Sequence, residues 1–298
     1  MQNDSAIIPL QAINDDITKK HGVHLFVLRL DLNHPHISGN KLFKLRYNLD
    51  KAKKQGKKTI LTFGGAFSNH IAATAAAGKE HNLNTIGIIR GDELKELNPT
   101  LKFATESGMK LHYVSRTLYQ NKKELYANIE QEFSNDNFYL IPEGGSNEFG
   151  IEGCKEIINE IKIDFDFICC PCGTGATMTG IVLSLKENQT AISFQVLKAE
   201  NYIQQEVQNW LEKYNYYQEN WSIKEEYHFG GYAKTKPELI TFIEQFEKQN
   251  GVPLDYIYTG KMMFGIYDLI KNDYFKSGQT IIAIHTGGLQ GNEGFKLT

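Results

Sequence analysis

The chain has 298 residues, of which 41% are hydrophobic and 22% are charged, so its composition is that of a globular protein and excludes a disordered one. Its net charge of −3 gives no electrostatic reason to expect nucleic acid or an anionic membrane as a partner. No apolar run approaches the roughly 20 residues of a membrane helix, and residues 1–5 do not begin a signal peptide. The length allows one large domain or two ordinary ones, and we expect a cytoplasmic protein.

Short runs rich in β-branched residues alternate with amphipathic stretches, in two sets. The first set predicts strands at residues 58–63, 85–89, 111–114 and 138–141, and helices at 69–78, 99–107 and 122–133. The second set predicts strands at 165–170, 193–198 and 280–285, and helices at 151–161, from 179, at 204–214 and after Pro237. Strands that alternate with helices of this length indicate βαβ units and parallel sheets. We therefore expect two α/β domains, with ligands bound beyond the carboxyl ends of strands.

The glycine-rich loop at residues 172–180 reads Cys-Gly-Thr-Gly-Ala-Thr-Met-Thr-Gly and lies between an apolar strand and a helix. Glycines let backbone N–H groups approach an anion closely, and the start of a helix adds free donors. The loop lacks the Gly-Lys-Ser/Thr of a P-loop, and Met178 stands where a GxGxxG motif has its third glycine. We interpret it as a phosphate site, with a tight turn that merely starts the helix as the alternative.

Two further loops come directly before predicted helical stretches. Residues 63–70, Phe-Gly-Gly-Ala-Phe-Ser-Asn-His, place Ser68 or Asn69 as a helix cap, where free N–H groups could bind a substrate carboxylate. The alternative is a plain N-cap. Lys41 follows Gly-Asn at the start of an amphipathic stretch, and such a lysine is ordinarily a solvated residue. Buried beside an anionic cofactor, its amine could have a lowered pKa and form a Schiff base.

The remaining motifs lie in the second half of the chain. Tyr-Thr-Gly-Lys at 258–261 and His-Thr-Gly-Gly at 285–288 indicate a close backbone approach, here to an aromatic ring. Cys-Cys-Pro-Cys at 169–172 contains a C-x-x-C pattern typical of dithiol redox sites, but the rest of a thioredoxin-like pattern is missing, so we interpret these cysteines as small buried residues. Cys154 would be the only nearby fourth ligand for zinc, so we expect no metal.

Together these motifs resemble one family, the pyridoxal-phosphate (PLP) enzymes called D-cysteine desulfhydrase and 1-aminocyclopropane-1-carboxylate (ACC) deaminase. Its members carry Gly-Asn-Lys-x-x-Lys-Leu, Ser-Asn-His or Ser-Asn-Gln, a Thr- and Gly-rich loop, Val-Tyr-(Thr or Glu)-Gly-Lys and His-(Thr or Leu)-Gly-Gly. This chain has the corresponding segments in the same order, at residues 39–45, 68–70, 174–180, 257–261 and 285–288. The resemblance runs from about residue 9 to residue 288.

The resemblance implies the α/β fold called fold type II of the PLP enzymes, similar to the tryptophan synthase β-subunit. It comprises two three-layer domains, each built on a parallel sheet. Residues 50–145 would form the small domain, inserted into a large domain made of residues 1–49 and 146–298. The family also suggests PLP as the cofactor, a small amino acid as the substrate and a homodimer as the assembly.

The resemblance assigns roles to individual residues. Lys41 would bind PLP covalently, Asn69 would hydrogen-bond its ring hydroxyl, and Thr259 would lie near its pyridine nitrogen. The phosphate would be bound by residues of the glycine-rich loop: Gly173, Thr174, Gly175, Ala176 and Thr177. The substrate carboxylate would be bound by the start of the second motif and a later turn: Ser68, Asn69, His70 and Ser146. Ser68, Tyr232 and Tyr258 would join Lys41 as catalytic residues. The role of Lys44 stays open between a second base and a surface charge.

The family chemistry begins when the substrate amine displaces Lys41, whose freed amine removes the α-proton before a β-substituent leaves. D-Cysteine would give pyruvate, sulfide and ammonia. ACC deaminases, which convert ACC to 2-oxobutyrate and ammonia, have Glu where this chain has Thr259, so we prefer desulfhydrase-like elimination. ACC deaminase and a PLP-binding homologue without turnover remain alternatives, since Phe43 and residues 289–295 depart from the family pattern. A thiol oxidoreductase using Cys169 and Cys172 is a further alternative.

Overall fold

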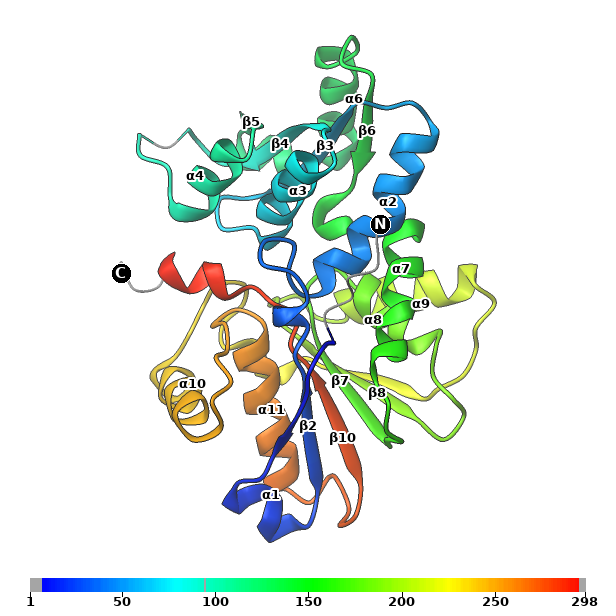
Figure 1. Cartoon of the computed structure of the whole chain (residues 1–298), viewed down its shortest axis with the longest axis vertical. Helices are drawn as coiled ribbons and strands as arrows, with labels where there is room; N and C mark the ends of the chain where they lie inside the picture. The colour runs from blue at the N-terminus through cyan, green and yellow to red at the C-terminus, as the bar shows by residue number, and fades with distance from the viewer. Residues whose placement is uncertain (1–6, 94, 295–298) are drawn as a thin grey trace.

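The structure is a computed structural model that describes residues 7–93 and 95–294. Residues 1–5, considered above as a possible signal sequence, and Phe295 of the segment after Gly288 lie outside the described residues. The chain forms two sheets, one above the other in Figure 1, each with helices on both faces. This is the two-domain α/β architecture expected from the sequence.

The larger sheet has six strands in the order β1-β2-β10-β7-β8-β9. The strands are β1 (Leu10–Ile13), β2 (His24–Leu28), β7 (Phe167–Cys172), β8 (Thr190–Gln195), β9 (Trp221–Lys224) and β10 (Thr280–Ile284). Every neighbouring pair is parallel except β1 and β2, which are antiparallel. The sheet is therefore parallel with one antiparallel edge strand.

Helices cover both faces of this sheet because side chains alternate along its strands. In β7, Cys169 belongs to the core beneath α1 (Asp16–His21), α10 (Pro237–Asn250) and α11 (Thr259–Lys271). Its neighbours Ile168 and Cys170 belong to the opposite core, beneath α7 (Glu148–Lys155), α8 (Ala176–Val182) and α9 (Tyr202–Lys213). A strand buried on both faces is typical of parallel sheets.

The smaller sheet has four parallel strands in the order β5-β4-β3-β6. The strands are β3 (Thr59–Gly65), β4 (Asn84–Arg90), β5 (Met109–Val114) and β6 (Phe138–Ile141). One face packs against α2 (Asn40–Lys54), α3 (Asn69–Glu80) and α4 (Pro99–Glu106), and the other against α5 (Arg116–Gln120) and α6 (Lys122–Glu132). All four strands lie between residues 59 and 141, which supports the proposed small domain at residues 50–145.

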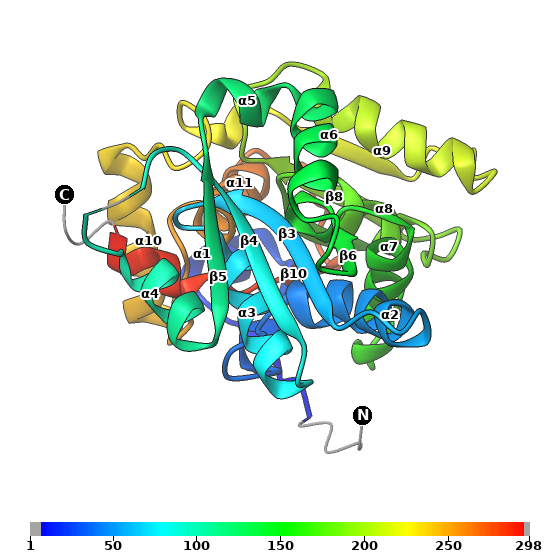
Figure 2. The same cartoon turned by 90° about the horizontal axis from the view of Figure 1, so that it is seen from above.

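Helix α2 connects the two hydrophobic cores, and the proposed boundary at residue 50 falls inside it. Leu45 and Leu49 pack with small-domain residues such as Ile60, whereas Phe43 packs in the core of the large sheet. α2 also lies directly against α7, as Figure 2 shows from above. The first turns of α2, α3 and α8 consequently meet near the carboxyl ends of β3, β4 and β7, between the two sheets.

Most predicted strands and helices are confirmed to within a few residues, but short or ligand-facing elements were missed. The strand expected at 193–198 lies at Thr190–Gln195, and the helix expected at 151–161 is α7 followed by the 3-10 helix Glu156–Glu160. The sequence analysis did not identify α1, α5, α11, β1, β2 or β9. Nor did it identify the other 3-10 helices, at Leu30–Leu32, Glu143–Gly145, Glu226–His228 and Leu289–Gly294. The missed strands have only four or five residues, too few for a clear period.

Replacing Gly153 by alanine should destabilise the protein by about 1–3 kcal/mol, as overpacked cores do. A Cβ at residue 153 would lie 1.9 Å from the carbonyl oxygen of Phe43, so α7 would have to move away from α2. Denaturant unfolding measures the change. Gly65→Ala is the control, because its Cβ would meet only the Arg90 guanidinium, at 3.4 Å. Equal stability of the two variants would contradict the close α2–α7 packing.

Candidate active site

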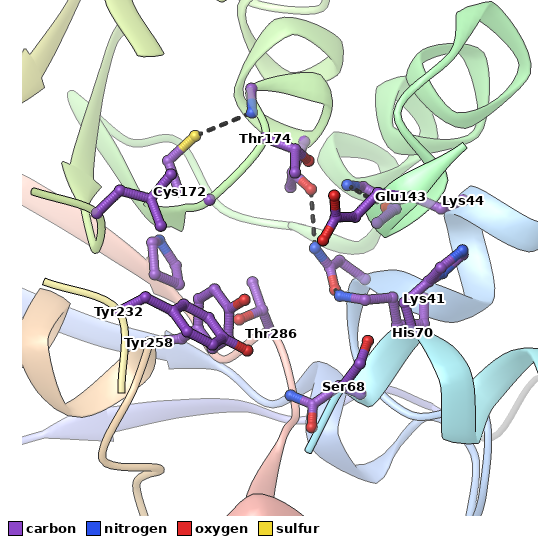
Figure 3. Close-up of a pocket in the computed structure, with 18 of the residues that line it drawn as sticks. Lys41, Lys44, Ser68, His70, Glu143, Cys172, Thr174, Tyr232, Tyr258 and Thr286 are labelled. Atoms are coloured by element: carbon purple, nitrogen blue, oxygen red, sulfur yellow. Dashed lines mark hydrogen bonds between the residues drawn. The ribbon is translucent and has the colours of Figure 1, made fainter. Parts of the chain in front are cut away.

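A cavity of about 290 Å³ lies between the two sheets and brings together most of the predicted site residues. Figure 3 shows Lys41, Lys44 and His70 on one side, with Tyr232 and Tyr258 on the opposite side. Ser68 and Thr174 occupy the remaining sides of the cavity. The sequence motifs therefore meet at one place although they are far apart along the chain.

The glycine-rich loop leads into the start of α8 and lines the cavity. Gly175 is the N-cap of α8 with φ 83°, and no side chain caps the first turn of the helix. Gly173 lies against the Tyr258 ring, and a Cβ there would be 3.4 Å from a ring carbon. Thr177 Oγ1 accepts a hydrogen bond of 2.8 Å from Asn40 Nδ2, which joins this helix to the first turn of α2. Uncapped N–H groups beside glycines suit a phosphate.

Lys41 is the second residue of α2, and the loop before it is tightly held. Gly39 has φ 74°, and a Cβ there would lie 1.9 Å from the carbonyl oxygen of Thr286, so only glycine fits. The Lys41 Nζ atom is 2.7 Å from Asn40 Oδ1. Burial, together with the positive charge of Lys44, lowers the pKa of Lys41 to about 7. A large fraction of its amine is then neutral near pH 7, which is the nucleophilic form.

Lys44 lies one turn further along α2 and also lines the cavity. Its Nζ donates a hydrogen bond of 2.9 Å to the carbonyl oxygen of Gly144, and burial lowers its pKa. Of the two roles left open for Lys44, the structure excludes that of a surface charge, because the side chain is buried.

His70 has one ring nitrogen, Nδ1, that is buried without a hydrogen-bond partner among the described residues. Thr62 donates its hydroxyl hydrogen to the carbonyl oxygen of Ile141 at 2.8 Å, so it must accept from His70 Nε2, which is 2.9 Å away. His70 Nδ1 is then unprotonated, and it has no hydrogen-bond partner among the described residues. Burial and the two lysine charges lower the pKa of His70 well below 6.5, so the ring stays neutral. This acceptor suits an N–H donor better than the carboxylate expected from the family.

The start of α3 serves both as a helix cap and as a wall of the cavity. Ser68 Oγ accepts a hydrogen bond of 3.3 Å from the N–H of Ile71, and both Ser68 and Asn69 line the cavity. Asn69 Oδ1 accepts from Gln290 Nε2 at 2.7 Å. Two residues further on, Asn292 Nδ2 donates to the carbonyl oxygen of Leu254 at 3.0 Å. The unusual segment after Gly288 is therefore in contact with the site.

The two predicted tyrosines form an aromatic wall. The ring centroids of Tyr232 and Tyr258 are 6.0 Å apart and nearly perpendicular. Burial raises the pKa of both hydroxyls, so they remain protonated donors at neutral pH. Lys261 Nζ donates hydrogen bonds of 2.8 Å to the carbonyl oxygens of His228 and Gly231, which hold the loop that carries Tyr232.

Three predicted site residues are not among those that line the cavity: Ser146, Ala176 and Thr259. Ser146 Oγ donates to the carbonyl oxygen of Thr174 and so supports the glycine-rich loop. The Thr259 hydroxyl donates to Asp255 Oδ2 at 2.6 Å, and Asp255 also accepts from backbone N–H groups at the start of α11. Thr286, unlike Thr259, lines the cavity. The Thr259 hydroxyl is thus bonded to a carboxylate four residues earlier, and its place near the cofactor ring stays a prediction.

Sequence reasoning missed five residues that line the cavity: Arg90, Glu143, Gly144, Leu197 and Tyr202. Arg90 directly follows the strand predicted at residues 85–89, and Glu143 follows the one predicted at 138–141. Both stand at carboxyl ends of parallel strands, where ligands bind in such folds. Their position after predicted strands could therefore have identified these two residues as candidates for the site.

All four cysteines lie in the interior of the large domain. Cys154, Cys169, Cys170 and Cys172 are buried and free, and burial raises the pKa of each thiol. Within residues 7–93 and 95–294, no group of three or more His, Cys, Asp or Glu side chains could hold a metal ion. In the same part of the chain, no helix has both the length and the apolarity to cross a bilayer.

With this geometry established, comparison with known proteins identifies the family. The model of the family of pyridoxal-phosphate dependent enzymes matches residues 5–287. The chain belongs to this family. It is 32% identical over 299 residues to the mitochondrial bifunctional D-cysteine desulfhydrase/1-aminocyclopropane-1-carboxylate deaminase of Arabidopsis thaliana, covering 91% of this chain and 74% of that protein. It is 25% identical over 291 residues to the D-cysteine desulfhydrase of Klebsiella pneumoniae, covering 90% of this chain and 87% of that protein.

A solved structure agrees with this assignment. The crystal structure of an ACC deaminase homologue superposes with a TM-score of 0.82 and 27% identity, covering 98% of this chain and 93% of that one. The resemblance inferred from the motifs is confirmed, as are the α/β fold with parallel sheets and PLP as the cofactor. The protein is a PLP-dependent enzyme related to ACC deaminases and D-cysteine desulfhydrases.

Replacing Lys44 by methionine should raise the pKa of Lys41, because it removes a neighbouring positive charge and keeps a similar apolar stem. The neutral Lys41 amine forms as the pH rises through its pKa of about 7, so PLP should bind covalently faster above that pH. We expect the midpoint of this pH dependence to move upward in Lys44→Met. The growth of visible absorption after PLP is added to apoprotein measures it.

Lys54→Met is the matched control, because Lys54 is exposed at the last position of α2. The titration of PLP itself is common to all three proteins, so only the difference between them reports on Lys41. An unchanged midpoint in Lys44→Met would contradict the coupling of the two lysines.

Proposed function

We propose that the protein catalyses the PLP-dependent α,β-elimination and deamination of a small amino acid, with D-cysteine as the favoured candidate. The observation that carries this proposal is Lys41, an amine whose pKa is lowered to about 7 inside a cavity that also has an anion-binding loop. A general base is most effective when its pKa lies near the working pH. D-Cysteine would yield pyruvate, sulfide and ammonia.

The side chains and backbone groups that line the cavity have the chemistry needed to bind PLP. Lys41 would bind PLP covalently, and the uncapped start of α8 with Gly173, Thr174 and Thr177 would bind its phosphate. Asn69 would hydrogen-bond its ring hydroxyl, since Gln290 already occupies the Asn69 oxygen and leaves the amide N–H groups. When bound, PLP supplies an electron sink for the substrate α-carbon.

The start of α3 would bind the substrate carboxylate. Backbone N–H groups at a helix N-terminus attract anions, and Ser68 and Asn69 add polar side chains at the same place. His70 Nδ1, a neutral acceptor, would accept an N–H from the substrate amine or from a neighbouring lysine. The substrate carboxylate would thus be held on the same side of the cavity as Lys41 and His70.

The amine of Lys41 would remove the α-proton, and a tyrosine hydroxyl would act on the opposite side. Tyr232 and Tyr258 face the lysines across the cavity, and both are protonated at neutral pH. Either hydroxyl could donate a proton to the departing β-substituent. Their aromatic wall would also exclude water from the reacting atoms.

Two alternatives remain from the sequence. ACC deaminase activity, giving 2-oxobutyrate and ammonia, is favoured by the names of several relatives, and Ser68 is then a candidate nucleophile because ACC has no α-proton. Thr259 in place of glutamate favours elimination instead, because no carboxylate is present at that position. A homologue that binds PLP without turnover is the second alternative. A cytoplasmic location and a homodimeric assembly stay predictions of the sequence analysis.

The purified protein should show the visible absorption of bound PLP, and D-cysteine should change that absorption and release sulfide and pyruvate. Lys41→Ala should lose both the covalent absorption and turnover. Absorption spectra with coupled keto-acid and sulfide assays measure these outcomes. A spectrum that ignores D-cysteine but changes with ACC would transfer the proposal to ACC deaminase. Wild-type protein without covalent PLP at Lys41 would overturn it.

A further inference from the structure

Arg90 lines the cavity, and its positive charge has no role in the proposed chemistry. It is the last residue of β4, and its backbone pairs in register with Gly65 of β3. Both residues line the cavity, and the absence of a side chain at Gly65 leaves room for the guanidinium. The Arg90 side chain is exposed, so a ligand that enters the cavity can reach it.

Arg90 has no negatively charged partner in the described part of the chain. Its guanidinium forms no ion pair and donates no hydrogen bond to residues 7–93 or 95–294. It lies 5.6 Å from the ring centroid of Tyr119, a buried residue of α5, which orients the planar group without neutralising it. Glu143 lines the same cavity, but its carboxylate contacts Lys122 at 3.1 Å. The Glu143 carboxylate is therefore already paired with a lysine.

The other anion-binding features are accounted for by the cofactor and by the substrate α-carboxylate. The glycine-rich loop suits the phosphate, and the start of α3 suits the carboxylate. Arg90 comes from a different strand end and offers a planar fork of donors, which matches carboxylate, sulfonate or phosphate oxygens. It is thus placed for a third anionic group.

We propose that Arg90 binds an anionic group at the far end of the substrate's β-substituent. This inference rests on the proposed elimination and adds a preference, among its substrates, for amino acids whose leaving group carries a carboxylate, sulfonate or phosphate. A substrate as short as D-cysteine would react without this contact. Arg90 is then a specificity residue, since it contacts the leaving group and takes no part in proton transfer.

The reaction itself balances without any further reactant except water. The α-proton passes to the Lys41 amine, the Cβ–X bond breaks, and its electron pair leaves with X. The leaving group takes up a proton as HX, and the remaining aminoacrylate reacts with water to give a keto acid and ammonia. Arg90 would stabilise the negative charge already present on X.

Matched substrate pairs test the proposal, each compared in D and L forms: O-phosphoserine with serine, O-succinylserine with O-acetylserine, and S-carboxymethylcysteine with S-methylcysteine. Wild-type enzyme should prefer the charged member by kcat/KM. Arg90→Gln should reduce that preference roughly 10- to 150-fold, the range expected for hydrogen bonds to a charged group. Arg90→Lys should fall between them, because it keeps the charge and loses the fork.

Arg116→Gln is the control, because Arg116 is exposed at the start of α5 and does not line the cavity. Its substrate preference should equal that of wild type. A loss in Arg90→Gln that is equal for both members of each pair would overturn the proposal and assign Arg90 to the α-carboxylate. Turnover of neutral members with no preference for charged ones would also overturn it, while leaving the proposed elimination intact.

A wild-type enzyme that releases no keto acid from any member of the panel would instead contradict the proposed function. Arg90 is then tested by binding alone, from the change in visible absorption as each amino acid is titrated into the PLP-bound protein. Tighter binding of the charged members that is lost in Arg90→Gln would support the anion site. Equal binding of both members in wild type would overturn it.

Discussion

The site depends on two lysine amines held in the same buried cavity at the start of one helix. Lys41 and Lys44 lie about one turn apart on α2, and water cannot solvate either charge well there. Desolvation lowers the pKa of both lysines, and the charge of Lys44 lowers that of Lys41 further, to about 7, so a large fraction of the Lys41 side chain is neutral amine near pH 7. Burial thus makes the Lys41 amine reactive. The effect is kept only if α2 cannot move to separate Lys41 from Lys44 or to expose them to water.

The rest of the structure supplies that restraint. Phe43 anchors the start of α2 in the core of the large sheet, and Leu45 and Leu49 anchor its middle in the small-domain core. Gly39 packs against the backbone after β10, and Gly153 lets α7 approach to the distance of a backbone contact. Both contacts leave no space for a side chain. The helix is therefore held at its first turn, at its flank and at both cores.

The sequence predicted the architecture well because parallel βαβ units leave a strong pattern of alternating strands and helices. It also identified most of the cavity, since Lys41, Ser68, Asn69 and the glycine-rich loop belong to short motifs. The hydrogen bond from Thr259 to Asp255 was not foreseen, because Asp255 is an ordinary polar residue in sequence and becomes a helix cap only in the fold. Arg90 and Glu143 belong to no motif, so only the meeting of strand ends shows that they share a cavity with Lys41.

The C-terminal segment Leu289–Gly294 has a mechanical consequence. Asn292 is bound to the backbone of Leu254 in the large domain, while Gln290 is bound to Asn69 at the start of α3 in the small domain. Two residues of one short 3-10 helix thus span the gap between the sheets. Movement of the sheets apart would lengthen the Gln290–Asn69 hydrogen bond, because its two residues belong to different domains. The position of the Asn69 amide is thereby coupled to the separation of the two sheets.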